Sequence, residues 1–261
     1  MSRDDLVLII PTFRRANKQV TFSRLPEKWR ARVTFVADRE DLPRLKKMYR
    51  KHGCDFAMQP DNIKGNAATR AWIIAQRQWD KMLMLDDDLR FDARRDGHLP
   101  RATDEEIDKG LRLVEAKLDE LVHCGISERQ GNHNRPPGWK ECGRVIAALG
   151  YRTSVLRECC ILGRILYRED YDYTLQLLRR GYMNAVYADL CCGQSAGSFA
   201  EGGHAASGRT IEANDAAAYQ LAALHPGLVR VVERKYRSGP DRLEVICYWK
   251  RAFNFDRNTL I

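Results

Sequence analysis

The first half of the chain alternates between short apolar runs and segments with helical spacing. Residues 6–10 and 32–37 are largely apolar runs of strand length, typical of strands buried on both faces of a parallel sheet. Apolar residues with helical spacing occupy residues 42–52, and a second helix is predicted at about residues 67–80, before the apolar run at residues 82–85. This alternation predicts an α/β fold with a Rossmann-like, mixed but mostly parallel sheet flanked by helices.

The second half contains one well-defined helix and several shorter elements. Thr103 and Glu106 have the spacing of a capping box, and apolar residues follow them at helical intervals. Residues 124–127 and 161–167 are predicted strands, whereas residues 130–143 are rich in Asn, Pro and Gly and are predicted to be a loop. No repeat, low-complexity tract or convincing linker divides the chain, so it is expected to form one domain.

The composition is that of a globular protein with an excess of positive charge. With 44% hydrophobic and 30% charged residues, the chain can bury a substantial core. Its formal net charge of +9 and isoelectric point near 9.2 favour a polyanionic partner, although solubility alone is the alternative explanation. Lys and Arg are interspersed with acids, so any basic surface must be created by folding.

Cysteine usage and hydropathy predict a cytoplasmic protein. Two pairs among the eight cysteines are sequence neighbours and none has the usual zinc spacing, so reduced core thiols are expected. The first residues lack the pattern of a signal peptide, and no run of 18 apolar residues could span a membrane.

Three carboxylates, Asp86, Asp87 and Asp88, directly follow the apolar run at residues 82–85. Acids at the carboxyl end of a buried strand repel one another unless a cation lies among them. Ligands of α/β sheets bind beyond these strand ends, and Mg²⁺ or Mn²⁺ there usually shares its oxygen ligands with phosphates. The run therefore suggests a metal site for a nucleotide diphosphate, with a solvated acidic turn as the alternative.

A second acidic group, Glu169 and Asp170, begins an amphipathic helix that ends at Gly181. Acids are favoured at a helix N-terminus by the macrodipole, so capping is the simplest interpretation, and Glu169 and Asp172 are expected to act mainly in this way. A general base also requires an ionised carboxylate on a rigid support that points into a cleft. Both interpretations are compatible with the pattern.

Five motifs occur in the order that is found in one class of nucleotide-sugar enzymes. They are residues 11–14 (Pro-Thr-Phe-Arg), Asp38, residues 64–70, residues 86–88 and residues 169–170. Together they resemble glycosyltransferases of the GT-A fold over about two thirds of the chain. The resemblance implies that about residues 1–122 bind a nucleotide sugar, and that about residues 123–261 supply the base, the acceptor site and a C-terminal extension on the acceptor side.

Four further segments indicate a narrower family. Residues 125–132, 173–179, 201–204 and 249–253 are similar to phage TET-associated glycosyltransferases, which are thought to add sugars to 5-hydroxymethylcytosine made in DNA by a TET-like dioxygenase. This resemblance implies a nucleotide-sugar donor, most simply a UDP-sugar, with Mn²⁺ or Mg²⁺ as cofactor and modified DNA as partner. An acceptor in DNA also fits the net charge of +9.

The resemblance assigns roles to individual residues of this chain. Donor binding falls to Pro11, Thr12, Arg14, Asp38, Asn66, Arg70, Asp86 and Asp87. Metal binding falls to Asp88, Asp86 and His204, although a lone histidine in a Gly-rich loop is as often an exposed bystander. Catalysis falls to Asp170, with Glu169 beside it, and a single displacement would invert the anomeric centre.

Basic and aromatic residues are interleaved in two regions that suit contacts to phosphates and bases. The candidates for acceptor binding are Arg129, Asn132, Arg135, Trp139, Lys140, Lys250 and Arg251. A base within a duplex would have to be flipped out to reach Asp170, and Trp139 is a candidate to fill the gap. A solvated basic surface is the alternative.

Three other functions compete with DNA glycosylation. A transferase for a cell-surface glycan is disfavoured by the strong basicity and the lack of a membrane anchor in the sequence. A nucleotidyltransferase would also place acids at strand ends, but it leaves the acids at residues 169–170 without a role. A non-catalytic nucleic-acid-binding module would need only the basic surface, and the complete set of acids argues against it.

Overall fold

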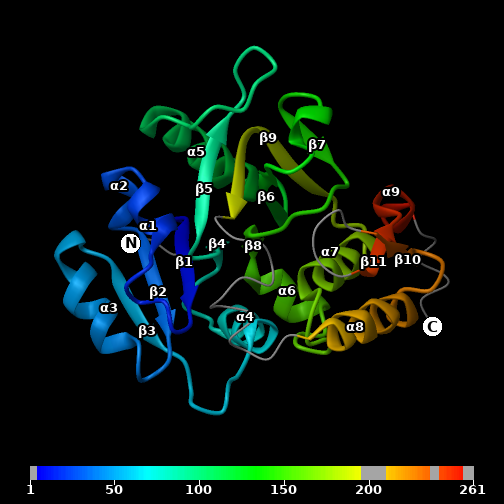
Figure 1. Cartoon of the computed structure of the whole chain (residues 1–261), viewed down its shortest axis with the longest axis horizontal. Coiled ribbons are helices and arrows are strands. Elements are labelled where there is room, and N and C mark those ends of the chain that lie inside the picture. The colour runs from blue at the N-terminus through cyan, green and yellow to red at the C-terminus, as the bar shows by residue number, and fades with distance from the viewer. Residues whose placement is uncertain (1–4, 195–209, 236–240, 255–261) are drawn as a thin grey trace.

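A nine-stranded mixed sheet forms the centre of the molecule (Figure 1). The computed structural model describes residues 5–194, 210–235 and 241–254, and all structural statements refer to these residues. The central strands are β1 (Val7–Thr12), β2 (Val33–Ala37), β3 (Asp55–Met58), β4 (Lys81–Leu85), β5 (Leu89–Ala93), β6 (His123–Glu128), β7 (Trp139–Glu141), β8 (Ala148–Arg152) and β9 (Asn184–Gln194). A separate antiparallel pair consists of β10 (Val229–Arg234) and β11 (Arg242–Cys247).

Helices connect most of these strands. They are α1 (Val20–Arg24), α2 (Glu27–Arg30), α3 (Leu42–Tyr49), α4 (Asn66–Ala75), α5 (Asp104–Glu120), α6 (Thr153–Cys159), α7 (Glu169–Arg179), α8 (Ile211–Leu224) and α9 (Trp249–Phe253). Two short 3₁₀ helices occupy Arg50–His52 and Asn132–Asn134. Figure 1 shows the N-terminal strands at one end of the molecule and α8, α9, β10 and β11 together at the other.

The strand order β3-β2-β1-β4-β8-β6-β9-β5 places the acidic run at residues 86–88 beside the ends of β1 and β2. Strands β3, β2, β1 and β4 are parallel neighbours, so their carboxyl ends meet at one edge of the sheet. Strand β8 is antiparallel to β4 and to β6, and β7 and β5 are antiparallel to β9. The mixed, mostly parallel α/β sheet expected from the sequence is confirmed.

Alternating side chains of the central strands fill two hydrophobic layers, one on each face of the sheet. In β4, Leu83 points into the layer that contains Leu111 and Val114 of α5. Its neighbour Met84 points into the opposite layer, which includes residues of α4, α6 and α7. Burial on both faces is the reason that β4 consists of apolar side chains apart from Lys81.

Helix α7 is buried on nearly all sides because it lies between two hydrophobic clusters. Ten of its eleven residues are buried. One side, with Tyr173 and Leu177, packs toward the central sheet. The other side, with Leu175 and Leu178, packs into a third cluster that also contains residues of α8, α9 and the β10–β11 pair. The C-terminal extension thus forms the outer support of the helix that begins with Glu169 and Asp170.

Three local predictions from the sequence differ from the structure. Residues 161–167 form no strand: Ile161 is 59% exposed, and its backbone N–H and C=O both bond to the side chain of Gln176. The helix predicted to reach residue 80 ends at Ala75, because Trp79 and Asp80 bond to the start of α6 instead. The loop predicted at residues 130–143 contains the short strand β7, which pairs with β9.

Two other predictions agree with the structure. The capping box of α5 forms: Thr103 Oγ1 accepts from the N–H of Glu106, and the Glu106 carboxylate accepts from the N–H of Thr103. All eight cysteines are free thiols that are buried or half-buried. Among the described residues, no helix has both the length and the apolar composition that crossing a bilayer requires.

Asp172 anchors the C-terminal extension to α7 and does not act as a helix cap. Its side chain is fully buried and accepts hydrogen bonds from Arg164, from His225 Nε2 at 2.7 Å and from Gln176 at 2.9 Å. Burial alone would raise the pKa of Asp172, but the bonds from His225 and Arg164 hold this pKa below its ordinary value. Asp172 therefore remains ionised inside the fold.

We expect Asp172→Asn to destabilise the fold, because it removes one partner of a buried ion pair and leaves Arg164 uncompensated. Losses of this kind cost about 3 to 5 kcal/mol in free energy of unfolding. Denaturant unfolding measures the change. Glu120→Gln, which breaks the exposed Lys117–Glu120 pair, is the control and should cost less than about 1 kcal/mol. Equal unfolding free energies for the Asp172 variant and the wild type would contradict the anchoring role.

Candidate active site

Three carboxylates extend from the end of β4 at the sheet edge where β1 and β2 also end. The N–H of Asp86 donates to the carbonyl of Ala147 at 3.0 Å. Thr21 binds the next turn, because its N–H donates to the carbonyl of Asp87 at 3.1 Å and its hydroxyl accepts from the N–H of Leu89. The backbone of the acidic run is therefore held on both sides, and its side chains are presented at a fixed edge.

Two arginines balance the charge of the acidic run. Arg15 Nη1 lies 2.8 Å from Asp87 Oδ1 and 3.2 Å from Asp88 Oδ2, while Arg70 Nη2 lies 2.6 Å from Asp86 Oδ1. Burial raises the pKa of Asp87 to about 7, although the charge of Arg15 opposes the shift. Burial and the charge of Asp86 also raise the pKa of Asp88. The cluster has more negative charge than the surrounding protein stabilises well, as expected of a cation site.

Arg70 connects the acidic run to the start of α7. Its side chain is only 6% exposed, and its second nitrogen, Nη1, lies 2.8 Å from Glu169 Oε1. Asn66 Nδ2, one turn earlier on α4, also reaches Glu169 Oε1, at 3.3 Å. Burial alone would lower the pKa of Arg70, but the charges of Asp86 and Glu169 raise it above the ordinary value. Arg70 is thus a charged bridge between the two acidic motifs.

Asp170 differs from the four other acids because its carboxylate is not engaged. Glu169 is buried against Arg70, and burial raises its pKa while Arg70 opposes that shift. Asp170 is 7% exposed, and within the described residues its carboxylate has no hydrogen bond or ion pair; only its backbone carbonyl accepts, from Thr174 Oγ1 at 2.8 Å. A carboxylate held on a buried helix and free of partners can accept a proton from a ligand.

The remaining donor-side candidates lie along the same edge. Thr12 ends β1 and is buried, with its hydroxyl accepting from Gln19 at 3.0 Å. Arg14 follows in a left-handed conformation, φ 55°, and is exposed above the Phe13 ring. Asp38 directly follows β2, and its carboxylate accepts from the N–H of Asp41 at 2.9 Å. Pro11 lies within β1 opposite Val36.

The described residues alone contain no group of three His, Cys, Asp or Glu side chains arranged to hold a metal ion. The carboxylates of Asp86 and Asp88 nevertheless fit a hard divalent cation, because they are oxygen donors at a crowded, half-buried, negatively charged site. Mg²⁺ is commonly bound by one or two carboxylates together with substrate phosphates. His204, the third expected ligand, lies outside the described residues.

Two residues at this site were not identified from the sequence. Arg15 is the partner of Asp87 and Asp88. Its position next to Arg14 in the motif after β1 was the available signal. Gln194, at the end of β9, donates to Asp86 Oδ2 at 3.0 Å. No local pattern identifies Gln194, because its position depends on the pairing of β9 with β5.

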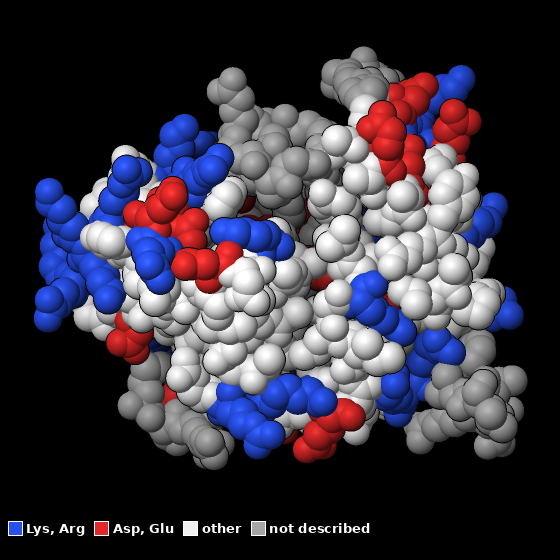
Figure 2. All heavy atoms as spheres, turned by 90° about the horizontal axis from the view of Figure 1, so that it is seen from below, with Lys and Arg blue, Asp and Glu red and all other residues white. Residues whose placement is uncertain are grey.

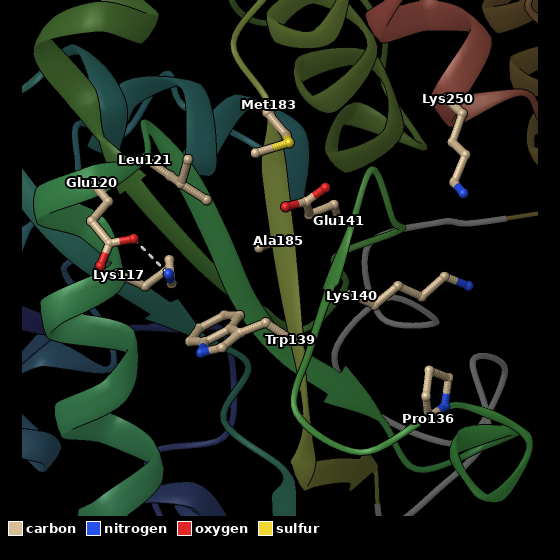
Figure 3. Close-up of a pocket in the computed structure, with 10 residues that line it drawn as sticks. All are labelled: Lys117, Glu120, Leu121, Pro136, Trp139, Lys140, Glu141, Met183, Ala185 and Lys250. Carbon is tan, nitrogen blue, oxygen red and sulfur yellow. Dashed lines mark hydrogen bonds and ion pairs between the residues drawn. The ribbon is translucent and has the colours of Figure 1, made fainter.

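Three of the acceptor-side candidates line one pocket (Figure 3). This pocket of 480 Å³ is formed by α5, β7, the start of β9 and α9. Trp139 and Lys140 come from β7 and Lys250 comes from α9. Trp139 packs 5.1 Å from the Tyr187 ring and beneath the Lys117 ammonium group, so it forms a wall of the pocket.

The other acceptor-side candidates have different environments. Asn132 is fully buried and bonds to Ser127 and Ala188, so it maintains the fold of its loop and is not available to an acceptor. Arg129 lies 2.8 Å from Asp92. Arg135 is half-buried, and Arg251 is exposed on α9.

The positive charge is not confined to the acceptor side. Figure 2 shows basic side chains gathered at the end of the molecule where Figure 1 places α3. Helix α3 and the 3₁₀ turn after it carry five exposed basic residues: Arg44, Lys46, Lys47, Arg50 and Lys51. The net charge of +9 is therefore weaker support for an acceptor-side polyanion than the composition suggests.

Comparison with solved structures shows the GT-A glycosyltransferase fold. Staphylococcus aureus TarS residues 1–349 in complex with UDP-GlcNAc matches with a TM-score of 0.55 and 15% identity over 84% of this chain and 66% of that chain. The mannosyltransferase PcManGT from Pyrobaculum calidifontis in complex with GDP-Man and Mn²⁺ matches with a TM-score of 0.56 and 11% identity, over 84% and 63%. This chain spans slightly less than two thirds of either structure.

A comparison of the sequence with family profiles identifies the family of this chain. The profile described as TET-Associated Glycosyltransferase matches residues 6–203, about three quarters of the chain. The chain belongs to this family, as the resemblance had indicated. None of the curated protein sequences is significantly similar to it.

Proposed function

We propose that this protein is an inverting, metal-dependent glycosyltransferase that moves a sugar from a nucleotide sugar to the hydroxyl of 5-hydroxymethylcytosine, or a related hydroxymethylpyrimidine, in DNA. The observation that carries the proposal is the juxtaposition of the acids at residues 86–88 with those at residues 169–170 through Arg70, in a chain that belongs to the TET-associated glycosyltransferases. Family membership supports the DNA acceptor, and the paired acidic motifs support the chemistry.

The donor site is proposed at the carboxyl ends of β1, β2 and β4. Pro11, Thr12 and Arg14 would face the nucleotide, Asp38 its base, and Asp86 its ribose. The likeness to structures that bind UDP-GlcNAc and GDP-Man supports a nucleotide-sugar donor, and a UDP-sugar is the simplest assignment. Arg70 was expected to contact the donor, but its guanidinium is occupied by Asp86 and Glu169, so we assign it to organising the site.

Asp86 and Asp88 would hold Mn²⁺ or Mg²⁺ together with the donor diphosphate. When bound, the metal would neutralise charge on the departing diphosphate. Arg15 is placed to balance the carboxylates that remain, because it contacts both Asp87 and Asp88.

Asp170 would act as the general base. Its carboxylate accepts the proton of the acceptor hydroxyl as that oxygen forms a bond to the anomeric carbon. The bond from this carbon to the diphosphate oxygen breaks on the opposite face, so the configuration inverts. Glu169 cannot share this role while it is bound to Arg70 and Asn66. One acid is thus left to act as a base and the other holds the site together.

The test is incubation of 5-hydroxymethylcytosine DNA with UDP-glucose, UDP-N-acetylglucosamine, UDP-galactose and GDP-mannose, each with Mn²⁺. Nucleoside mass spectrometry should detect a hexosyl or N-acetylhexosaminyl adduct with one of these donors, and unmodified DNA should give none. EDTA should stop the reaction, and Asp88→Ala should lack activity while its circular dichroism matches the wild type. Transfer to a glycan acceptor without any transfer to DNA would instead support the cell-surface alternative.

Asp170→Asn should bind the donor and melt like the wild type but lose about 10²- to 10⁴-fold in kcat, the usual cost of removing a general base. Donor affinity is measured by calorimetry and kcat by product formation. Asp104→Asn, which alters an acid in the first turn of α5, is the matched control and should keep full activity. A near wild-type rate for Asp170→Asn, or a product that retains the donor configuration, would refute the mechanism.

Acceptor affinity should fall as salt rises, with a log–log slope of about 0.9 per phosphate contact on duplex DNA. Charge reversal of both Lys250 and Arg251 should flatten this slope by up to about 2, since two contacts would be lost. Charge reversal of Lys46 and Lys47 on α3 changes the net charge equally and should leave the slope unchanged. Equal slopes for the two double variants would exclude α9 from the DNA-binding surface.

A further inference from the structure

The side chain of Tyr151, on β8, has a buried hydroxyl that is not used by the proposed mechanism. Tyr151 is 1% exposed, and within the described part of the chain its hydroxyl has no hydrogen-bond partner. Buried polar groups are almost always hydrogen-bonded, because a buried group without a partner loses its bonds to water and forms no bond that offsets this free-energy cost. A phenylalanine would fill the same space without this cost. The hydroxyl therefore requires an explanation.

Contacts through His123 place Tyr151 beside α7 at Thr174, one turn after Asp170. The Tyr151 and His123 rings are stacked with their centroids 4.5 Å apart. His123 Nε2 lies 3.1 Å from Thr174 Oγ1, and Thr174 in turn donates to the backbone carbonyl of Asp170 at 2.8 Å. After burial, the negative charge of Asp170 is the largest influence that raises the pKa of Tyr151, with Arg70 and Glu169 also within range.

The Tyr151 hydroxyl and the Asp170 carboxylate are a donor and an acceptor that both lack a partner within the residues that the structure describes. The Tyr151 hydroxyl can donate a proton and lacks an acceptor, while the Asp170 carboxylate can accept and lacks a donor among the described residues. Two other polar side chains of this region have partners: Glu169 accepts from Arg70 and Asn66, and the hydroxyl of Tyr173 accepts from the N–H of Gly163 at 3.1 Å.

We propose that Tyr151 is a positioning residue, whose hydroxyl donates a hydrogen bond to the Asp170 carboxylate when an acceptor, either the DNA hydroxyl or a water molecule, occupies the site. This inference rests on the proposed role of Asp170 as the base. The bond would fix one carboxylate oxygen, so that the other faces the acceptor hydroxyl. A base that is turned away from the reacting oxygen loses rate without loss of donor affinity, because Tyr151 is not among the residues that are proposed to bind the donor.

The test is Tyr151→Phe, which removes only the hydroxyl. We expect kcat to fall about 10- to 100-fold, the scale of a modest misplacement of a catalytic group. Donor KM should change less than about threefold, and the melting temperature should equal or exceed that of the wild type because an unpaired buried group is lost. A purely structural tyrosine would not lower kcat while stability is kept.

Tyr173→Phe is the matched control. Tyr173 is equally buried, on α7 itself, but its hydroxyl already has a partner in the N–H of Gly163. Removing that hydroxyl leaves the N–H unpaired, so the melting temperature should fall while kcat stays within about threefold of the wild type. We therefore expect Tyr151→Phe to lower kcat without lowering the melting temperature, and Tyr173→Phe to lower the melting temperature with little change in kcat.

A double variant tests whether Tyr151 acts through Asp170. In an Asp170→Asn background, Tyr151→Phe should cause no further loss of kcat, because the carboxylate that it orients is gone. A full additional loss in that background, an unchanged kcat in the single variant, or a fall in melting temperature as large as that of Tyr173→Phe would each overturn the inference.

Hydrolysis of the nucleotide sugar by water separates this inference from the proposed acceptor. The reaction needs a base but no DNA, and it is measured for the same variants as release of free nucleotide. If the wild type hydrolyses a donor but does not modify 5-hydroxymethylcytosine DNA, the proposed acceptor is wrong, and the hydrolysis rates still decide the role of Tyr151. If the wild type modifies the DNA and Tyr151→Phe does so equally well, only the inference fails.

Discussion

The buried guanidinium of Arg70 is the interaction on which the rest of the site depends. It joins Asp86, at the end of a strand, to Glu169, at the start of a helix that lies 83 positions further along the chain. Three charges can be buried together only when each is compensated at hydrogen-bond distance, and both carboxylates meet this condition through one arginine. Because Arg70 is itself held within α4, the distance between the two acidic motifs is set by the packing of that helix against the sheet.

The same requirement explains how a fold can place five acids in a small volume. Four of them are divided between two arginines, Arg15 and Arg70, and the fifth, Asp170, has no such partner among the described residues. This division gives neighbouring carboxylates different ion-pair partners although the functional group is the same. Glu169 and Asp170 are adjacent on one helix, yet Glu169 forms an ion pair with Arg70 and the Asp170 carboxylate has no ion pair among the described residues.

The sequence allowed the prediction of those features that depend on local pattern. The apolar runs at β1, β2 and β4, the capping box of α5 and the acids at strand and helix ends are all local, and the structure contains them. Features that depend on distant pairing could not be predicted. Residues 161–167 have the composition of a strand but no strand to pair with, whereas β7 forms in a Pro-rich loop because β9 offers an edge. The burial of Asp172 depends on His225, 53 residues away.

The residues that pack against the outer side of α7 extend beyond the segment that the family profile matches. The family profile ends at residue 203, but the outer side of α7 is covered by residues of α8, α9 and β10–β11, all of which follow that point. A chain shortened to residue 203 would retain every described acid of the site while exposing Leu175 and Leu178 to water. The segment that the family profile matches and the smallest segment that keeps the apolar surfaces of α7 covered are therefore different lengths of polypeptide, because residues after 203 pack against the outer side of this helix.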